Sequence, residues 1–411
     1  MIIGIEVQRL FRRKKHGMEI VALEILRELQ KKDHKNQFVI FAKDDVDKDC
    51  FVESKNFIID ACSKALFPIW EQLRLRRAVK KAAPDFLHCT SNTAPLFCKI
   101  PLIITIHDII YLESLNFSGS TYQNFGNIYR RIVVPIVAKQ AAIILTVSEY
   151  EKNVIASRLK IPENKIRVIY NGVNSQFHPI TDHELLEAFR QEYNLPGKFL
   201  LHFGNTAPKK NTIGALEAYK MYFEKAPVPL PLVLTDCTSE HINDLLEQIK
   251  APELIEHIQI LDYIPFDSIP CLYNLATIFL YPSLRESFGM PLIEAMACGV
   301  PVITSNSSAI PEIAGGAASL IDPTKPIEIC DQIILLLSDT SLYKDRREKG
   351  FKNATRFSWE NAALKTEAVY NELRPENKRR ESLGLFDRII AVLKLQLNML
   401  GVSHKPLTNK E

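Results

Sequence analysis

The residues from Glu286 to Pro301, ESFGMPLIEAMACGVP, combine two carboxylates with a glycine and a proline directly after an apolar run. Pro291 fits the first position of a helix, because its missing N–H would have no partner there. The amides of Phe288, Gly289 and Met290 would then form the positive end of that helix. Such an end binds phosphate, and a glycine lets a ligand approach the backbone closely.

The two glutamates of this segment are suited to hydroxyl groups. Glu294 lies one turn inside the predicted helix, where a carboxylate can accept two hydrogen bonds from a vicinal diol such as ribose. Glu286 precedes the helix and could bind hydroxyls of a group beyond the phosphate. The segment is therefore predicted to bind ribose, phosphate and a polyol. An ordinary strand-loop-helix with solvent-facing acids is the alternative on spacing alone.

Three further residues stand at the ends of apolar runs. Lys209 and Lys210 follow FLLHFG, so we expect them at the carboxyl end of a strand, where a lysine binds phosphate as a point charge. His107 ends the run LIITIHD. Two solvated loop lysines and a structural histidine are the alternatives.

The elements that must position these residues are short β-branched runs that alternate with longer amphipathic stretches. Several runs are almost continuously apolar, which is typical of parallel strands covered on both faces. The predicted strands are 2–7, 37–42, 86–90, 102–108, 142–148, 166–172, 199–204, 231–237, 258–264, 277–283, 300–306 and 318–322, and clear helices are 18–32, 212–226 and 239–251. This alternation predicts an α/β fold with parallel sheets.

Twelve strands are too many for one open sheet, and after the predicted strand 166–172 the chain contains no predicted strand up to residue 198. We therefore expect two doubly wound domains, residues 1–175 and 176–355, that face each other across a cleft. Ligands of such sheets bind beyond the carboxyl ends of the strands. Two such sheets suit one ligand held by each and a reaction between the two ligands.

Composition limits the class of protein. With 46% hydrophobic and 24% charged residues, the chain is typical of a globular protein, and a net charge of +3 is too small to indicate a nucleic-acid partner. The eight cysteines have no metal-ligand spacing, which favours a reducing compartment and hence the cytoplasm. We expect neither a signal peptide nor a transmembrane helix, since no run of about 18 apolar residues occurs.

The segment ESFGMPLIEAMACGVPV is similar to the E-x7-E signature of retaining glycosyltransferase family 4, which has the GT-B fold of two Rossmann-like domains. The resemblance covers about residues 1–373 and includes TIHD, LTVSEYEKN, VIYNGVN, HFGNTAPKKN and FLYPSLRESFG, in the order of the family. It implies that Glu286 contacts the donor sugar, Glu294 the ribose, and Lys209 and Lys210 the diphosphate. Asn205 stands where the family often has a phosphate-binding arginine, so that contact is missing.

The resemblance also assigns residues of the first domain, which would be the acceptor-side domain. It places His107 against the donor sugar near the reacting carbon. The basic stretch RLFRRKKHGMEIVALEI matches the family's glycine loop, so His16, Gly17 and Met18 would line the acceptor side, with Gly17 for backbone approach. Residues 176–355 would bind the nucleotide sugar. The helix at 356–373 would return to the first domain, and residues 374–411 would form an extension with an interfacial helix.

The function implied is transfer of a sugar, with retention, from GDP-mannose or a UDP-sugar to a hydroxyl of a lipid-linked glycan in surface polysaccharide biosynthesis. No metal or other cofactor is expected. A basic helix in WEQLRLRRAVKKAA could lie on anionic lipid at the inner face of the cell membrane, or be a merely solvated face. Three alternatives are a nucleotide-sugar epimerase of the same fold, a non-catalytic nucleotide-sugar-binding scaffold, and a metal-dependent transferase that uses Asp45 and Asp47.

Overall fold

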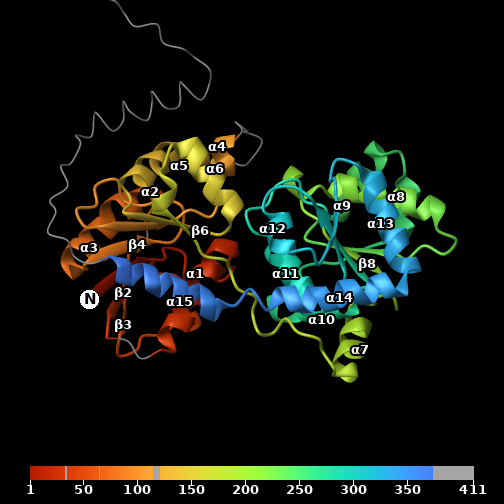
Figure 1. Ribbon diagram of the computed structural model, residues 1–411, viewed down its shortest axis with the longest axis horizontal. Coiled ribbons are helices and arrows are strands. Elements are labelled where there is room, and N and C mark those ends of the chain that lie inside the picture. Colours follow the sequence, from red (N-terminus) through yellow and green to blue (C-terminus); the bar gives the residue numbers. More distant parts are fainter. Residues whose placement is uncertain (33–34, 64, 114–120, 374–411) are drawn as a thin grey trace, which may run out of the picture. The chain divides into compact units, whose positions relative to one another are not determined.

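The computed structural model describes residues 1–32, 35–63, 65–113 and 121–373. The chain divides into two compact units. The described residues of the first unit are those of Met1–Thr146 and Lys152–Val168 and those from Lys365 to residue 373, and the second unit contains Val147–Glu151 and Ile169–Leu364. Each unit has a parallel sheet with helices, so the predicted α/β class with two doubly wound domains is confirmed (Figure 1).

The first unit is built on a seven-stranded sheet with the order β3-β2-β1-β4-β5-β6-β7, in which every paired strand is parallel. The strands β4 and β6 are buried at every position, as expected for strands that are covered on both faces. The bounds are β1 (Ile2–Glu6), β2 (Gln37–Lys43), β3 (Phe57–Cys62), β4 (Phe86–Cys89), β5 (Leu102–Thr105), β6 (Ile143–Thr146) and β7 (Ile166–Val168).

Helices of the first unit lie between these strands. The longest with fully described side chains, α1, turns an apolar face that includes Val21, Leu26 and Leu29 to the core. The helical segments are α1 (Gly17–Gln30), η1 (Lys48–Cys50), α2 (Phe67–Ile69), the π-helix η2 (Trp70–Leu75), α3 (Arg76–Ala82), α4 (Ile110–Glu113), α5 (Thr121–Gln140), α6 (Glu149–Leu159) and η3 (Glu163–Lys165). The first residues of α6 belong to the second unit.

The second unit has a six-stranded parallel sheet with the order β10-β9-β8-β11-β12-β13. Successive residues of a strand point to opposite faces. In β11, Ile278 and Leu280 pack on one core cluster, and Phe279 and Tyr281 pack on another. The bounds are β8 (Leu200–Phe203), β9 (Leu232–Thr235), β10 (Ile258–Ile260), β11 (Ile278–Tyr281), β12 (Val302–Ser305) and β13 (Ser319–Ile321).

Helices cover both faces of this second sheet. The cluster around Leu280 includes residues of α8, α9 and α13, whereas the cluster around Phe279 includes residues of α10, α11 and α12. The segments are α7 (His183–Glu192), η4 (Pro208–Lys210), α8 (Thr212–Lys225), α9 (Ser239–Gln248), η5 (Pro252–His257), η6 (Phe266–Ser268), α10 (Ile269–Leu275), α11 (Met290–Ala297), α12 (Ile310–Ala314), α13 (Pro326–Ser338) and α14 (Thr340–Ala354).

The last described helix, α15 (Trp359–Glu372), belongs to both units, because the division falls between Leu364 and Lys365. Within the first unit, the Tyr370 hydroxyl lies 2.7 Å from His88 Nδ1 of β4. The predicted interfacial helix in residues 374–411 lies outside the described residues. No helix in the described part of the chain is long and apolar enough to cross a bilayer.

The strand order of an open parallel sheet shows where its ligands usually bind. The chain order reverses between β1 and β4 in the first unit and between β8 and β11 in the second. Loops at the carboxyl ends of such neighbouring strands form the ligand crevice. In the second unit, these are the loops that carry Lys209, Lys210 and Glu286.

Several strands are shorter than predicted; β7, for example, ends at Val168 and not at residue 172. Two further differences from the sequence prediction concern β3 and α11. The edge strand β3 was not predicted; its burial pattern is mixed, and Ile58 is 49% exposed, so it lacks a continuous apolar run. The helix α11 begins at Met290, so Pro291 is at its second position instead of the first. Its missing N–H still falls among the first four, which have no partner inside a helix.

Candidate functional site

The loop between β11 and α11 positions the first glutamate of the E-x7-E segment. Glu286 is 7% exposed, and its backbone N–H donates a hydrogen bond to Ser308 Oγ at 3.0 Å. The Phe288 side chain is buried and contacts the Phe357 ring with centroids 5.5 Å apart. The side chain of Phe288 therefore anchors the loop to the core, and only its backbone is suited to a ligand.

Gly289 has a conformation that only glycine adopts easily. It is the N-cap of α11 with φ +95°, and a Cβ added there would lie 2.9 Å from Ile310 Cδ1. The sequence interpretation assigned this glycine to close approach by a ligand. The structure shows that backbone conformation and packing require glycine at this position independently of any ligand.

Lys210 and Glu286 form an ion pair at the carboxyl end of the second sheet. Lys210 Nζ lies 2.7 Å from Glu286 Oε1 and 3.4 Å from the Tyr281 hydroxyl. It also lies 5.2 Å from the centre of the Tyr281 ring, within the range of a cation–π interaction. The structure thus brings together the predicted phosphate-binding lysine and the predicted sugar-binding acid.

The charge of Glu286 depends on this arrangement. Burial by itself raises the pKa of Glu286, but the charges of Lys210 and Lys209 outweigh it and hold that pKa below its ordinary value. Glu286 is therefore an ionised acceptor at neutral pH. An ionised carboxylate beside a cation can bind sugar hydroxyls while the cation attracts phosphate.

Glu294, the second glutamate of the segment, lies in α11 and, among the described residues, has no lysine beside it of the kind that pairs with Glu286. It is 8% exposed, and Tyr273 donates a hydrogen bond to its Oε2 at 3.4 Å. Burial raises the pKa of Glu294 to about 7, and the hydrogen bond from Tyr273 only partly opposes this effect. A buried carboxylate with this pKa gains from two further hydroxyl donors, as a ribose diol would supply.

The loop that carries the two lysines is held against the β11 loop. Lys209 accepts a hydrogen bond through its carbonyl from the Leu284 N–H at 2.7 Å. Asn211, the N-cap of α8, donates from Nδ2 to the carbonyls of Pro282 and Pro323. Asn205, which stands in place of the family's arginine, accepts from the Ala207 N–H and has no cationic role.

Four residues that support this site were not singled out in the sequence: Tyr273, Tyr281, Asn211 and Ser308. Tyr281 is the last residue of β11, and Asn211 follows Lys210 directly, so their positions beside the motifs gave a signal. Tyr273 and Ser308 are distant in sequence from the residues they contact, and no local pattern indicated them.

His107 belongs to the first unit, where it follows β5. It is 7% exposed, and its ring Nε2 lies 2.9 Å from the Thr90 carbonyl. The backbone N–H of His107 donates to Asn92 Oδ1 at 2.7 Å. Burial lowers the pKa of His107, so the ring is neutral near pH 7. A carbonyl only accepts hydrogen bonds, so Nε2 carries the proton and Nδ1 is left as an acceptor.

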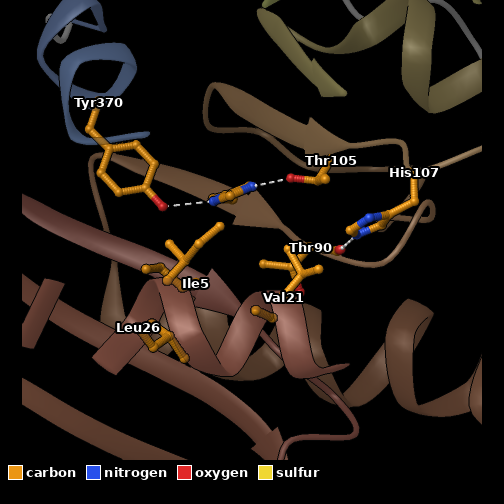
Figure 2. Close-up of a pocket in the computed structure, with 10 residues that line it drawn as sticks. Ile5, Val21, Leu26, Thr90, Thr105, His107 and Tyr370 are labelled. Atoms are coloured by element: carbon orange, nitrogen blue, oxygen red, sulfur yellow. Dashed lines mark hydrogen bonds between the residues drawn. The ribbon is translucent and has the colours of Figure 1, made fainter. Parts of the chain in front are cut away.

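A small cavity lies beside His107 and is lined mainly by β1, α1, β4 and α15 (Figure 2). His88 is one of the lining residues, and its ring nitrogens lie within hydrogen-bond distance of the Tyr370 hydroxyl and Thr105 Oγ1. The cavity volume is about 30 Å³, which suffices for about one water molecule and not for a sugar ring. Its lining is mostly apolar, and we assign it no ligand.

The residues predicted to line the acceptor side lie at the start of α1. His16 is the N-cap, and its N–H donates to Glu19 Oε2 at 2.7 Å. A Cβ added to Gly17 would meet no atom within 4 Å. Open space there is compatible with a ligand near the backbone, and it leaves no packing reason for a glycine. Met18 is half-buried.

The rival metal pair does not form a cluster in the described part of the chain. Asp47 forms an ion pair with Lys15. Among the described residues, no group of three or more His, Cys, Asp or Glu side chains is arranged to hold a metal ion. All eight cysteines are free thiols.

Two family models match the sequence. Residues 16–177 match Glycosyltransferase Family 4, and residues 186–353 match Glycosyl transferases group 1. The second match contains the Lys210–Glu286 pair and Glu294. The first contains His107 and the start of α1.

Individual relatives agree with these matches. The chain is 32% identical over 234 residues to the O-antigen chain mannosyltransferase B of Escherichia coli, and this match covers 57% of the chain and 61% of the relative. It is 27% identical to the O-antigen chain mannosyltransferase RfbU of Salmonella typhimurium, covering 61% and 64%. The matches thus span less than two thirds of these relatives' lengths.

A solved structure has the same fold. The Anabaena protein Alr3699/HepE, in complex with UDP-glucose, superposes with a TM-score of 0.70 over 91% of this chain and 100% of that one. The two sequences are 18% identical. At this identity, the likeness concerns the fold alone.

Proposed function

The chain belongs to glycosyltransferase family 4, and we propose that it transfers a sugar from a nucleotide diphosphate sugar to a hydroxyl of a glycan acceptor. The observation that carries this proposal is the contact between Lys210 and Glu286 beside the start of α11. It combines a cation and helix-end amides for a diphosphate with an ionised acid for a sugar. Glu294, one turn further, is suited to the ribose.

The donor we propose is GDP-mannose, with a UDP-sugar as the alternative. The loop GNTAPKKN resembles that of mannosyl-transferring family members, and two relatives are named mannosyltransferases. The names of these relatives also include the O-antigen chain, which supports a role in surface polysaccharide biosynthesis.

Transfer would proceed with retention at the anomeric carbon. The bond from that carbon to the phosphate oxygen breaks, and a bond to the acceptor oxygen forms on the same face. Lys209, Lys210 and the first amides of α11 would stabilise the charge on the leaving diphosphate. The departing phosphate oxygen would take the acceptor proton, so neither a side-chain base nor a metal ion is needed.

Turnover of the Glu286→Gln variant tests this function. Nucleotide sugars are first screened for an upward shift of the melting temperature, since a ligand at about 100 times its dissociation constant adds roughly 2.7 kcal/mol of stability. With the best donor, Glu286→Gln should reduce transfer on the order of 100-fold, and Glu253→Gln, on the exposed surface, should not.

The same assay separates the alternatives. An epimerase would release a changed nucleotide sugar without any acceptor, a scaffold would bind the donor without turnover, and a metal-dependent transferase would stop when a chelator is added. Absence of donor binding and transfer across the screen would refute the proposal.

We further propose that the acceptor is lipid-linked and that the first unit works at an anionic membrane surface. Trp70, Leu75 and Val79 of the basic segment pack in the core, so they are not available to contact lipid. Other apolar side chains, at the N-cap of α2 and on α2, η2 and α5, are exposed: Leu66 (72%), Ile69 (46%), Leu73 (50%), Phe125 (56%), Ile128 (46%) and Ile132 (42%).

These two helical segments are neighbours, because Gln72 Nε2 and the Tyr129 hydroxyl lie 2.8 Å apart. Exposed basic residues follow on the same segment: Arg74, Arg76, Arg77, Lys80 and Lys81. Apolar side chains next to clustered cations fit the interface of an anionic bilayer.

Sedimentation with liposomes tests the membrane proposal. The full chain should sediment with vesicles that contain phosphatidylglycerol, and much less with phosphatidylcholine alone. A Leu66→Ser/Ile69→Ser/Leu73→Ser variant should lose this recovery, whereas Leu185→Ser, at an exposed leucine of α7, should keep it. Equal recovery of all three proteins would refute the membrane surface.

A further inference from the structure

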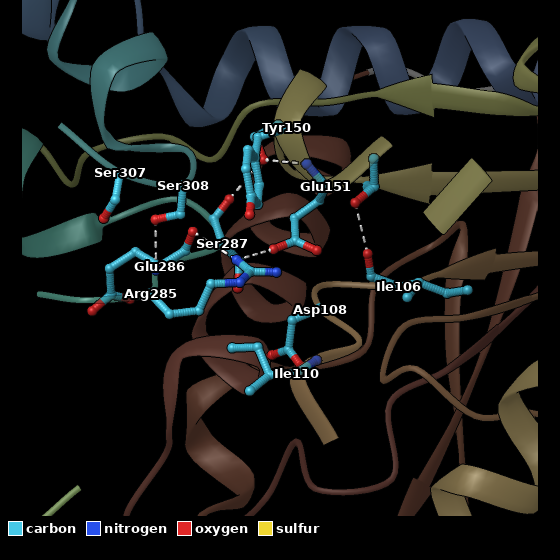
Figure 3. A network of polar contacts seen from close by, with 12 residues as sticks. Ile106, Asp108, Ile110, Tyr150, Glu151, Arg285, Glu286, Ser287, Ser307 and Ser308 are labelled. Atoms are coloured by element: carbon cyan, nitrogen blue, oxygen red, sulfur yellow. Dashed lines mark hydrogen bonds and ion pairs between the residues drawn. The ribbon is translucent and has the colours of Figure 1, made fainter. Parts of the chain in front are cut away.

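A buried ion pair lies directly beside the proposed sugar-binding acid. Arg285 immediately precedes Glu286, and its Nη1 lies 2.5 Å from Glu151 Oε1 (Figure 3). The Arg285 side chain is 13% exposed, and that of Glu151 is fully buried. Both residues belong to the second unit, although they are 134 positions apart in the sequence.

Arg285 also holds the backbone of its neighbour. The same Nη1 donates a hydrogen bond to the Glu286 carbonyl at 3.0 Å. The guanidinium carbon lies 4.8 Å from the centre of the Tyr150 ring, in a cation–π contact. The guanidinium therefore has a carboxylate, a carbonyl and an aromatic face as partners, which leaves it little freedom to move.

The segment from Ser148 to Glu151 makes a second contact with the loop. Ser148 Oγ donates to the Ser287 carbonyl at 2.7 Å, and the Glu151 N–H donates to the same Oγ at 3.2 Å. One segment thus binds Arg285 through its carboxylate and Ser287 through its hydroxyl.

That segment is itself fixed by an acid of the second unit. The carboxylate of Glu312 accepts hydrogen bonds from the N–H groups of Glu149 and Tyr150, at 2.8 and 3.1 Å. These are the first amides of α6, where a carboxylate is favourable. The Ser148–Glu151 segment is therefore a firm support for the loop.

The backbone of Glu286 is consequently held from both sides. Its N–H is bound by Ser308, its carbonyl by Arg285, and the next carbonyl by Ser148. Removing two charges from water is costly unless their geometry and hydrogen bonds compensate. A buried pair at this place is better explained by positional precision than by its contribution to stability.

We infer that Arg285 and Glu151 are positioning residues that fix the carboxylate of Glu286 for the reacting sugar. The inference rests on the proposed function for its effect on turnover. Displacement of a reacting or orienting group by about 1 Å can cost on the order of 100-fold in rate. The pair would therefore act on kcat, whereas Glu294 would act on the binding of the nucleotide.

The test replaces Glu151 by Gln, which keeps the size of the side chain and removes its charge. We expect kcat to fall at least tenfold while KM for the donor changes less than threefold. The matched control is Asp331→Asn, which removes the charge of an exposed ion pair with Lys225 in the same unit. Arg285→Lys, which keeps the charge, should retain more activity than Arg285→Met.

Ser148→Ala provides a variant without an unpaired charge, in case Glu151→Gln does not fold. Ser148→Ala should also lower kcat, by a smaller factor than Glu151→Gln. A merely structural role predicts a lower melting temperature with kcat unchanged at a temperature where the variant is folded. That result, in Glu151→Gln or in Ser148→Ala, would overturn the inference.

Hydrogen–deuterium exchange separates this inference from the proposed function. Peptides covering residues 284–292 should exchange faster in Glu151→Gln or Ser148→Ala than in Asp331→Asn. Unchanged exchange there would overturn the positioning role even if the wild-type protein transferred sugar. If the wild-type protein bound and transferred no sugar, faster exchange would still support the fixed loop, and only the proposed function would fail.

Discussion

Lys210 Nζ lies 2.7 Å from Glu286 Oε1, so the cation predicted for the diphosphate and the acid predicted for the sugar are in direct contact. Family resemblance assigns the two residues to different parts of the donor. Their contact means that each influences the other, because the lysine charge keeps the buried carboxylate ionised. A change at one residue should therefore alter the function assigned to the other.

Substituting Lys210 by Met should move the pH dependence of transfer. The pKa of Glu286 now lies below its ordinary value, because the lysine charges outweigh burial. With Lys210 removed, burial is opposed mainly by Lys209, so the pKa of Glu286 should rise. Activity that needs ionised Glu286 would then be lost at a higher pH as the solution is acidified. A pH profile of kcat/KM measures this shift.

Lys225→Met is the control for that profile, since Lys225 pairs with Asp331 on the surface. In Lys225→Met, the acidic limb of the kcat/KM profile should lie at the same pH as in the wild type. An acidic limb that stays in place in Lys210→Met, with only the donor KM raised, would show that the lysine binds phosphate without controlling Glu286.

Nucleotide affinity should depend on pH through Glu294. Burial raises the pKa of Glu294 to about 7, and a ribose diol would stabilise its ionised form by donating two hydrogen bonds. Binding should therefore release a proton below pH 7, and affinity should weaken by up to about tenfold per pH unit below that value. Calorimetry in buffers of different ionisation enthalpy measures the proton release. Glu294→Gln should bind weakly with no such dependence, and constant wild-type affinity between pH 6 and 8 would contradict the role.

Substitution by alanine should affect stability at Gly289 and not at Gly17. Gly289→Ala places a side chain at φ +95° and 2.9 Å from Ile310 Cδ1, so it should lose about 1–2 kcal/mol from the backbone alone and bind nucleotide more weakly. Gly17→Ala meets open space and should leave the unfolding free energy unchanged. If an acceptor approaches the backbone there, Gly17→Ala should still raise KM for the acceptor. Chemical denaturation and transfer kinetics measure both effects.

The inner strands β9, β11 and β12 of the second unit could be predicted from the sequence because they are buried on both faces and therefore almost continuously apolar. The edge strand β3 could not be predicted, because a strand at the edge of a sheet tolerates exposed and charged residues such as Asp60. The start of α11 was predicted one residue too late, because proline is accepted at more than one position of a first helical turn.

Only part of the proposed site could be predicted from the sequence. Glu286, Glu294 and Lys210 lie in motifs with a fixed spacing, so their types and order indicated a nucleotide-sugar site. The pair between Arg285 and Glu151 joins residues far apart in the chain, and each alone reads as a surface charge. Only the fold reveals that Glu151 is fully buried.

Glu6, at the end of β1, should oppose stability at high pH. It is 3% exposed, and burial, with a smaller effect of Glu71, raises its pKa to about 8. Between its unfolded pKa near 4.5 and about 8, the unfolded chain loses this proton while the folded protein keeps it. Stability should therefore fall as pH rises through this window.

Glu6→Gln removes that titration and can still accept the hydrogen bond from the Gln8 N–H. Compared with the wild type, the variant should gain unfolding free energy as pH rises from 5 to 9, on the order of 1.4 kcal/mol for each unit of pKa shift. Urea denaturation at several pH values measures this difference, with the exposed Glu163→Gln as the control. A difference that is constant over the whole pH range would show that Glu6 ionises in the folded protein as it does in the unfolded chain.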